Sequence, residues 1–176
     1  MLYTNVSIHW IADHVDTESG CIIVKDKFIP LSTHTVQCVL GIPSSGRKNE
    51  WTDADTGRQA FLDKIGKSCL LSITSFGDSL LQDQSMSDED VIRNFVVVAL
   101  GTFLCPNLTE FPSSEYLIPL VDAVKCRQWN WCEFVHQWFM MQIRKYSDLK
   151  KKAEHCFYWG WRLFVFVMCE WSSLIC

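Results

Sequence analysis

The feature that most constrains the fold is an unbroken apolar run, residues 95–100, in which every side chain is hydrophobic. Ser87 precedes it as a candidate helix N-cap, and the acidic residues 88–90 follow, where a helix dipole favours negative charge. Pro106 forbids continuation of the helix beyond Cys105. An amphipathic surface helix keeps one polar side, which this run lacks. The sequence therefore predicts a helix from Ser87 to Cys105 that is covered on nearly all sides and forms the centre of the fold.

The N-terminal segment predicts a hairpin followed by a helix. Two apolar stretches, residues 21–24 and 27–31, are separated by a short polar pair and are typical of a small β-hairpin. Ser32 or Thr33 can then cap a helix, and Gly41 can end it. These local signals predict both the start and the stop of that helix.

The rest of the chain is mainly helical in pattern. We expect a weak helix over residues 57–65, a short helix capped by Ser113 or Ser114, and a long helix from Arg127. Residues 70–81 fit a strand or a helix equally well. The long helix presents one apolar stripe along its length: Cys132, Val135, Trp138, Phe139, Ile143 and Tyr146.

The composition is that of a globular chain. Hydrophobic residues make up 48% and charged residues 20% of the 176 residues, which is long enough to bury a core. We expect a mainly α fold, an irregular helical bundle with one small N-terminal β-hairpin, in a single domain over residues 1–176. The net charge of −4 argues against a broad nucleic-acid footprint.

The cysteines and the apolar C-terminal segment bear on the cellular compartment. Nine cysteines at irregular spacing, behind an N-terminus without a secretion signal, favour reduced thiols and an intracellular protein, nuclear or cytoplasmic. Residues 156–176 are the one candidate membrane segment, but Arg162 and Glu170 interrupt them. Each charge costs about 2.5–3.5 kcal/mol near the centre of a membrane helix. We therefore expect a buried helix and no membrane association.

Two patterns approach known site chemistry without completing it. Residues 41–48 resemble a phosphate-binding loop, but Arg47 and Lys48 stand where lysine and a hydroxyl residue are needed. Cys132 and His136 lie four residues apart, a workable spacing for two zinc ligands on a helix. The remaining candidates fit no zinc module: Cys126, His155 and Cys156.

No cysteine has the local signature of a nucleophile, although a Cys–His–Asp set can be assembled on paper from so many residues. We therefore assign no catalytic, cofactor-binding or metal-ligating residue. We expect no enzymatic activity, no cofactor and no small-molecule substrate.

Two features are candidate binding surfaces. A basic patch, Lys150, Lys151 and Lys152, can contact phosphates, although a run this short is more typical of a solvated helix end. The C-terminal aromatic residues can form a partner-binding face or pack in a core: Trp159, Trp161, Phe164 and Trp171. We expect a protein partner or self-association, and nucleic acid only as a weaker alternative.

Several short motifs occur in the order found in a known protein group. They are Val36-x2-Val39-Leu40-Gly41-Ile42-Pro43, Leu100-Gly101-Thr102-Phe103-Leu104-Cys105-Pro106, Tyr116-Leu117-x2-Leu120-x-Asp122, Trp129-x-Trp131 and Ile143-x-Lys145-Tyr146. With these motifs the chain resembles the plant mobile domain group of transposon-associated, aminotransferase-like proteins, of the grass type sometimes found upstream of a Ulp1-like cysteine protease domain. The resemblance covers residues 5–48 and 87–168, whereas residues 49–86 depart from the group.

The resemblance implies a mostly helical domain with no catalytic residue that can be placed here. We expect a non-enzymatic protein-interaction or scaffold domain of a plant transposon-derived protein. The alternative is the non-catalytic N-terminal region of a Ulp1/SUMO-protease-like cysteine peptidase without its catalytic domain. Because relatives continue well beyond the equivalent of Cys176, we expect the C-terminal end to be truncated.

Overall fold

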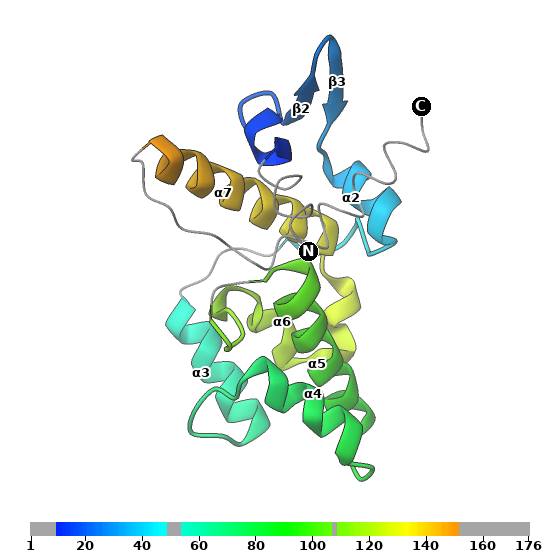
Figure 1. The fold of residues 1–176 in the computed structure, drawn as a ribbon. Helices are drawn as coiled ribbons and strands as arrows, with labels where there is room; N and C mark the ends of the chain where they lie inside the picture. The colour runs from blue at the N-terminus through cyan, green and yellow to red at the C-terminus, as the bar shows by residue number, and fades with distance from the viewer. Residues whose placement is uncertain (1–9, 49–53, 107–108, 152–176) are drawn as a thin grey trace. The chain divides into compact units, whose positions relative to one another are not determined.

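A computed structural model describes residues 10–48, 54–106 and 109–151 of the chain (Figure 1). The fold is mainly α, with a small three-stranded antiparallel sheet near the N-terminus, as the sequence predicts. The chain divides into two compact units, unit 1 (Met1–Ser44 with Trp131–Cys176) and unit 2 (Ser45–Asn130). The single domain expected over the whole chain stays a prediction, since the units are compact subdivisions of one polypeptide.

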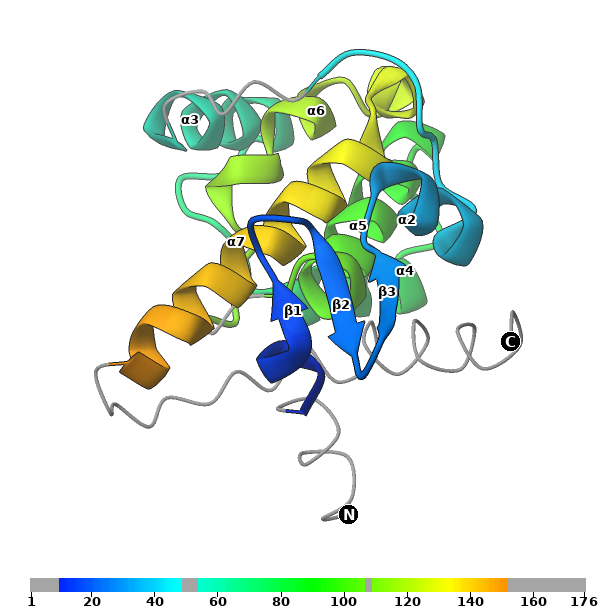
Figure 2. The ribbon, with the colours of Figure 1, turned by 90° about the horizontal axis from the view of Figure 1, so that it is seen from above.

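Unit 1 contains the sheet. The strands β1 (Val15–Asp16), β2 (Cys21–Val24) and β3 (Lys27–Pro30) pair antiparallel in that order (Figure 2). The predicted hairpin is therefore confirmed, and β1 adds a third strand. Lys25, with φ of 54°, occupies the left-handed region in the tight turn between β2 and β3. Pro30 is tolerated because β3 is an edge strand.

A capped helix follows the sheet. The side chain of Ser32 accepts a hydrogen bond from the backbone of Thr35 and starts α2 (Thr33–Leu40). Gly41 ends α2 in the left-handed conformation, with φ of 63°, and its N–H donates to the carbonyl of Gln37. Both boundaries agree with the sequence signals.

The long helix α7 (Trp131–Lys151) packs against α2. It begins later than Arg127, because residues 123–128 form the 3-10 helix η3 (Ala123–Gln128). It continues without interruption to Lys151. The predicted stripe is buried except at Tyr146, which is half-buried. Four further residues of α7 are also buried: Trp131, Phe134, Met140 and Gln142.

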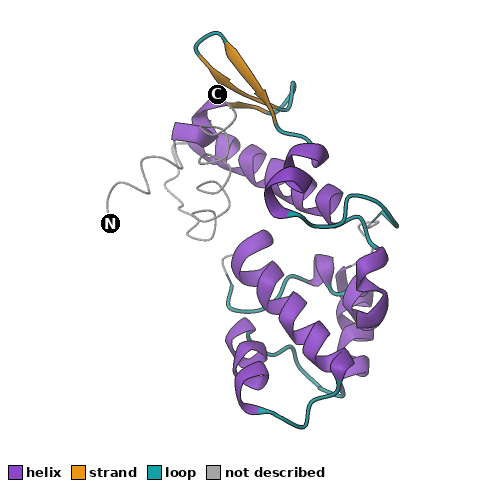
Figure 3. Cartoon of the chain, turned by 90° about the vertical axis from the view of Figure 1, so that its right-hand side faces the viewer, coloured by secondary structure: helices purple, strands orange, loops and turns teal. Residues whose placement is uncertain are grey.

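Unit 2 is a cluster of short helices, with no strand drawn among its described residues (Figure 3). In chain order its remaining elements are α3 (Ala54–Ile65), α4 (Ile73–Gln82), α5 (Asp88–Ala99), the π-helix η1 (Leu100–Leu104), the 3-10 helix η2 (Ser114–Tyr116) and α6 (Ile118–Val121). Each of these six elements contributes a buried side chain to the core: Phe61, Phe76, Val97, Leu100, Tyr116 and Leu120. Residues 70–81, whose sequence fits a strand or a helix equally well, contain most of the helix α4, which is capped by Ser72.

The central helix of unit 2 is less covered than its sequence indicates. The α-helical part ends at Ala99, and a π-helix completes the segment to Leu104. Phe95 is 63% exposed, and Val91 and Ile92 are also exposed. The prediction of a helix covered on nearly all sides is therefore wrong. Within unit 2, α4 and the α6–η3 segment pack on α5 and leave a further side open to solvent.

Candidate functional site

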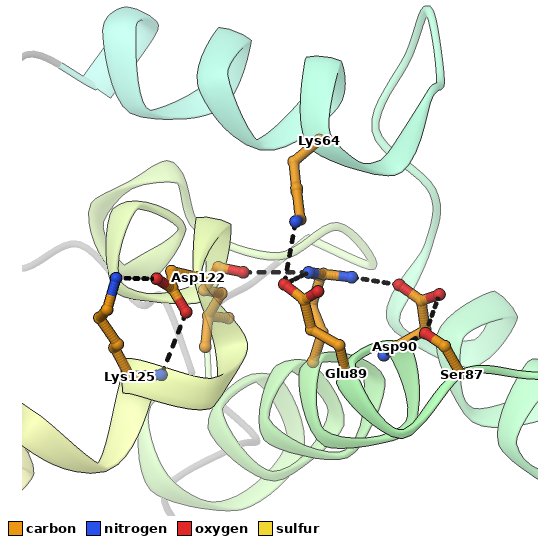
Figure 4. Close-up of polar contacts among 8 residues, drawn as sticks. Lys64, Ser87, Glu89, Asp90, Asp122 and Lys125 are labelled. Atoms are coloured by element: carbon orange, nitrogen blue, oxygen red, sulfur yellow. Dashed lines mark hydrogen bonds and ion pairs between the residues drawn. The ribbon is translucent and has the colours of Figure 1, made fainter.

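A buried arginine anchors the inward side of α5. Arg93 is 1% exposed, and its Nε donates a hydrogen bond of 3.0 Å to the carbonyl oxygen of Leu120 in α6 (Figure 4). Its guanidinium also pairs with the carboxylates of Glu89, at 2.7 Å, and Asp90. A buried charge is tolerated only when it is paired and hydrogen-bonded, and this arginine satisfies both conditions. The Nε hydrogen bond therefore holds α5 against α6, and the two carboxylates of α5 balance the buried charge.

The network extends to neighbouring helices of unit 2. Glu89 also accepts an ion pair of 3.0 Å from Lys64 of α3 (Figure 4). At the start of η3, Lys125 Nζ lies 2.6 Å from Asp122 Oδ2, and hydrogen bonding from Lys125 lowers the pKa of that carboxyl. These contacts tie α3, α5 and the α6–η3 segment into one charged cluster. Such a cluster positions helices, and each of the three guanidinium nitrogens of Arg93 already has a partner within unit 2.

Sequence reasoning missed this network, although a signal was present. Acidic residues three and four positions before an arginine on a helix are spaced for ion pairs. Glu89 and Asp90 were interpreted only as favourable charges at the helix N-terminus. Asp90 has both roles, because its backbone N–H donates to Ser87 Oγ and its carboxylate binds Arg93.

The outward side of the α4–α5 pair carries exposed apolar residues. Residues 91 and 95 are one helical turn apart on α5, and Leu81, 84% exposed, lies near the end of α4. Two exposed carboxylates, Asp78 and Asp88, each lie three residues before one of these apolar positions. We call this surface the α4–α5 outer face and define it by Asp78, Leu81, Asp88, Val91 and Phe95.

The motif Leu100–Pro106 is buried at both ends and more exposed in the middle, at Thr102. The backbone N–H of Cys105 donates to the carbonyl of Leu100 at 2.7 Å, the spacing of a π-turn. Gly101 lies against α4, and a Cβ there would be 2.5 Å from Cδ1 of Ile73 and 3.3 Å from the hydroxyl of Tyr116. Glycine is therefore required for close packing at this point.

Burial keeps the Cys105 side chain uncharged. Desolvation, with a smaller contribution from the carboxylate of Glu115, raises the pKa of the Cys105 thiol well above its ordinary value. Burial likewise raises the pKa of Tyr116. A thiol acts as a nucleophile through its thiolate, so this cysteine is inert at neutral pH.

The zinc candidates have structural partners in unit 1. The Cys132 thiol donates to the carbonyl of Ile42 at 3.2 Å, and Nε2 of His136 lies 2.9 Å from the carbonyl oxygen of Leu31. In the part of the chain that the structure describes, no three histidine, cysteine or acidic residues gather as a metal site. Of the remaining zinc candidates, Cys126 is buried in unit 2, and His155 and Cys156 lie outside the described residues.

The stretch resembling a phosphate loop is used for backbone pairing. The Arg47 N–H donates to the carbonyl of Gln128 at 2.7 Å, and the Asn130 N–H donates to the carbonyl of Arg47 at 2.8 Å. Gly46, with φ of 122°, sits directly against the Gln128 carbonyl. The backbone of Arg47 therefore joins the two ends of unit 2, and its N–H is bound to the Gln128 carbonyl and not directed at a ligand.

The predicted binding surfaces fall mostly beyond the described part of the chain. Lys150 Nζ binds Asp13 Oδ1 at 2.6 Å, and this contact raises the pKa of Lys150. Lys151 ends α7, but its side chain is not described, and Lys152 lies outside the described residues. The aromatic candidates Trp159, Trp161, Phe164 and Trp171 also lie outside them.

Among the residues that the structure describes, no helix has the length and apolar character needed to cross a membrane. The family model of a domain of unknown function, DUF8566, matches residues 5–164. No curated protein and no solved structure matches the chain.

Proposed function

The chain belongs to the DUF8566 family, and from this premise we propose that it is a non-enzymatic protein-interaction domain with a scaffold role. The observation that carries the proposal is the exposure of Phe95, Val91 and Leu81 on the α4–α5 outer face. Fully burying one such side chain is worth roughly 1.5–3 kcal/mol, so three together offer on the order of 5 kcal/mol to an association. Clustered apolar residues with a charged rim are typical of protein interaction sites.

The Arg93 network supports this role by fixing the helix that presents the face. Arg93 holds one side of α5 to α6, and Glu89 connects the same helix to α3 through Lys64. A binding surface on a helix that is already ordered loses less conformational entropy when a partner docks. The buried Arg93 network thus fixes α5 in place, and the exposed side of the same helix is available for a partner.

The resemblance to plant mobile domain proteins supports a more specific placement. We propose that the domain is part of a plant transposon-derived protein that acts inside the cell, in the nucleus or the cytoplasm. Its partner is another protein or a second copy of the chain. This proposal rests on the order of the motifs at residues 36–43, 100–106 and 116–122.

The test compares the proteins bound by the full chain and by two matched variants in plant cells. The double variant Val91→Ser/Phe95→Ser removes the apolar side chains of the face, and Phe28→Ser removes an equally exposed one from β3. We expect quantitative mass spectrometry to show at least a tenfold loss of specific partners for the double variant alone. Identical partner sets for all three chains, each folded by circular dichroism, would contradict the proposal.

A further inference from the structure

The sides of α5 can be assigned from its contacts. Arg93 and Val97 are buried on the inward side. Val98 is directed at α4, because a Cβ at Gly77 would lie 3.9 Å from its Cγ2. Successive residues of a helix advance by about 100°, so Val91 and Phe95 lie next to the α4-facing side and away from the core.

The same reasoning places Leu81 on this outward side. Phe76 of α4 points into the core, and Gly77 is directed at α5. Leu81 lies about 40° beyond Gly77 around the helix, away from Phe76. The two helices pack together (Figure 1), so Leu81 on α4 and Val91 and Phe95 on α5 flank a shared outer surface.

The charge around this surface has one sign. From residue 68 to residue 124 the sequence contains a single basic residue, the buried Arg93. The same stretch contains eight acidic residues: Asp78, Asp83, Asp88, Glu89, Asp90, Glu110, Glu115 and Asp122. Because Glu89 and Asp90 neutralise Arg93, the uncompensated charge at the rim comes from exposed Asp78, Asp83 and Asp88.

We propose that the α4–α5 outer face binds an amphipathic helix of a partner protein, with apolar residues on one side and lysine or arginine at its flanks. This inference rests on the proposed function and specifies the chemistry of the partner. Two packed helices offer a groove into which a third helix fits by its ridge of apolar side chains. The face runs from Asp88 to Phe95, about 12 Å of helix, which matches roughly two turns of an incoming helix.

Basic flanks follow from electrostatic complementarity. Rim charges of one sign attract partners of the opposite sign and repel like-charged ones, mainly through the association rate. An acidic helix, or an anionic lipid surface, would meet repulsion from Asp78, Asp83 and Asp88. The apolar residues supply the affinity, and the acidic rim selects the partner.

The experiment measures binding of two designed 20-residue peptides to the full chain by fluorescence anisotropy. Both peptides carry the same leucine stripe at helical spacing, and their flanks are lysine in one and glutamate in the other. We expect the lysine peptide to bind at least tenfold more tightly than the glutamate peptide. Its affinity should fall severalfold between 0.05 and 0.5 M salt, roughly the range over which surface charges become screened.

Matched variants locate the site. Phe95→Ser should weaken the lysine peptide at least tenfold, whereas Phe28→Ser should not. Asp78→Asn/Asp88→Asn should reduce the preference for lysine over glutamate, and Glu18→Gln/Asp26→Asn, which removes two exposed charges of unit 1, should preserve it. Equal binding of the two peptides, or binding that is insensitive to Phe95→Ser, would overturn the inference.

The outcomes separate this inference from the proposed function. If neither peptide binds while partners in plant cells still depend on Val91 and Phe95, the basic-helix inference fails and the interaction role stands. If the chain dimerises in analytical ultracentrifugation and Phe95→Ser abolishes the dimer, the α4–α5 outer face binds a second copy of the chain, and the basic-helix inference fails. If neither peptides nor cellular partners depend on the face, both proposals fail.

Discussion

At the scale of single residues, Arg93 is the one buried charged side chain among the described residues. It is 1% exposed and combines one hydrogen bond to a backbone carbonyl with two ion pairs. Removing one member of a buried charged group leaves the others without a partner. Because Glu89 keeps its pair with Lys64 and Asp90 reaches solvent, the loss is smaller than for a fully buried pair.

We predict that Arg93→Met lowers the free energy of unfolding by about 2–4 kcal/mol. Lys125→Met is the matched control, since Lys125 also forms an ion pair but is exposed, and it should change stability by less than about 0.5 kcal/mol. Urea denaturation followed by circular dichroism measures both. Equal effects of the two substitutions would show that the Arg93 network is not an anchor.

The buried thiol and phenol of unit 2 predict how stability depends on alkaline pH. Burial raises the pKa of Cys105 above its ordinary 9.0 and also raises that of Tyr116. Above pH 9 the unfolded chain therefore releases protons that the folded chain retains, and stability falls as pH rises. We expect the free energy of unfolding to be lower at pH 10 than at pH 8, and Cys105→Ala to show a smaller decrease. A wild-type value that is constant over this range would contradict the prediction.

At the scale of elements, the α4–η1 contact depends on glycine at position 101. A Cβ there would lie 2.5 Å from Cδ1 of Ile73, which is too close without movement of the Ile73 side chain or of α4. Gly77 of α4 has room, since its nearest neighbour would be 3.9 Å away. The two glycines therefore have different reasons to be present.

We predict opposite effects of alanine at these two positions. Gly101→Ala should destabilise the chain by about 1–3 kcal/mol through overpacking, whereas Gly77→Ala should stabilise it by about 0.4–1 kcal/mol. Adding Ile73→Val to Gly101→Ala removes the clashing methyl group and should recover part of the loss. Thermal unfolding of the wild type and these three variants provides the measurement. A destabilising Gly77→Ala would show that the packing of α4 on α5 is tighter than described.

Which elements the sequence predicts depends on whether their signals are local. Ser32, Ser87 and Gly41 define helix boundaries through their own side chain or backbone, and all three are confirmed. Residues 70–81 also contain a local signal, since Ser72 caps α4, but the serine, threonine and glycine that follow it weaken the helical pattern. The sequence carries no local signal for the π-helix, which includes Gly101 packed against Ile73.

The candidate site could not be located from the sequence, for a related physical reason. A run of apolar residues indicates that burying the helix is favourable. It does not indicate how many neighbouring elements pack against that helix. The helix α5 is covered on some sides by α4 and by the α6–η3 segment, whereas Phe95 is exposed. The acidic excess between Lys67 and Lys125 was visible in the sequence, but its meaning depends on knowing that Arg93 is buried.

At the scale of the whole molecule, unit 2 is an insertion between the two parts of unit 1, and its own ends are joined. The Arg47 N–H donates to the Gln128 carbonyl, and the Asn130 N–H donates to the Arg47 carbonyl, which forms a short parallel bridge. Unit 2 also has its own buried core and the Arg93 network. A segment with joined ends and its own core meets the requirements for independent folding.

We therefore predict that residues 45–130, expressed alone, fold cooperatively. Helical circular dichroism and a single urea transition are the expected results, and Arg93→Met should lower the stability of the fragment by as much as it lowers that of the full chain. Lys125→Met in the fragment is again the control. Because the bridge at Arg47 lies entirely within this fragment, trimming it to residues 50–127 should cost stability by removing those hydrogen bonds. A fragment 45–130 that is helical but unfolds without a cooperative transition would show that the core of unit 2 requires the rest of the chain.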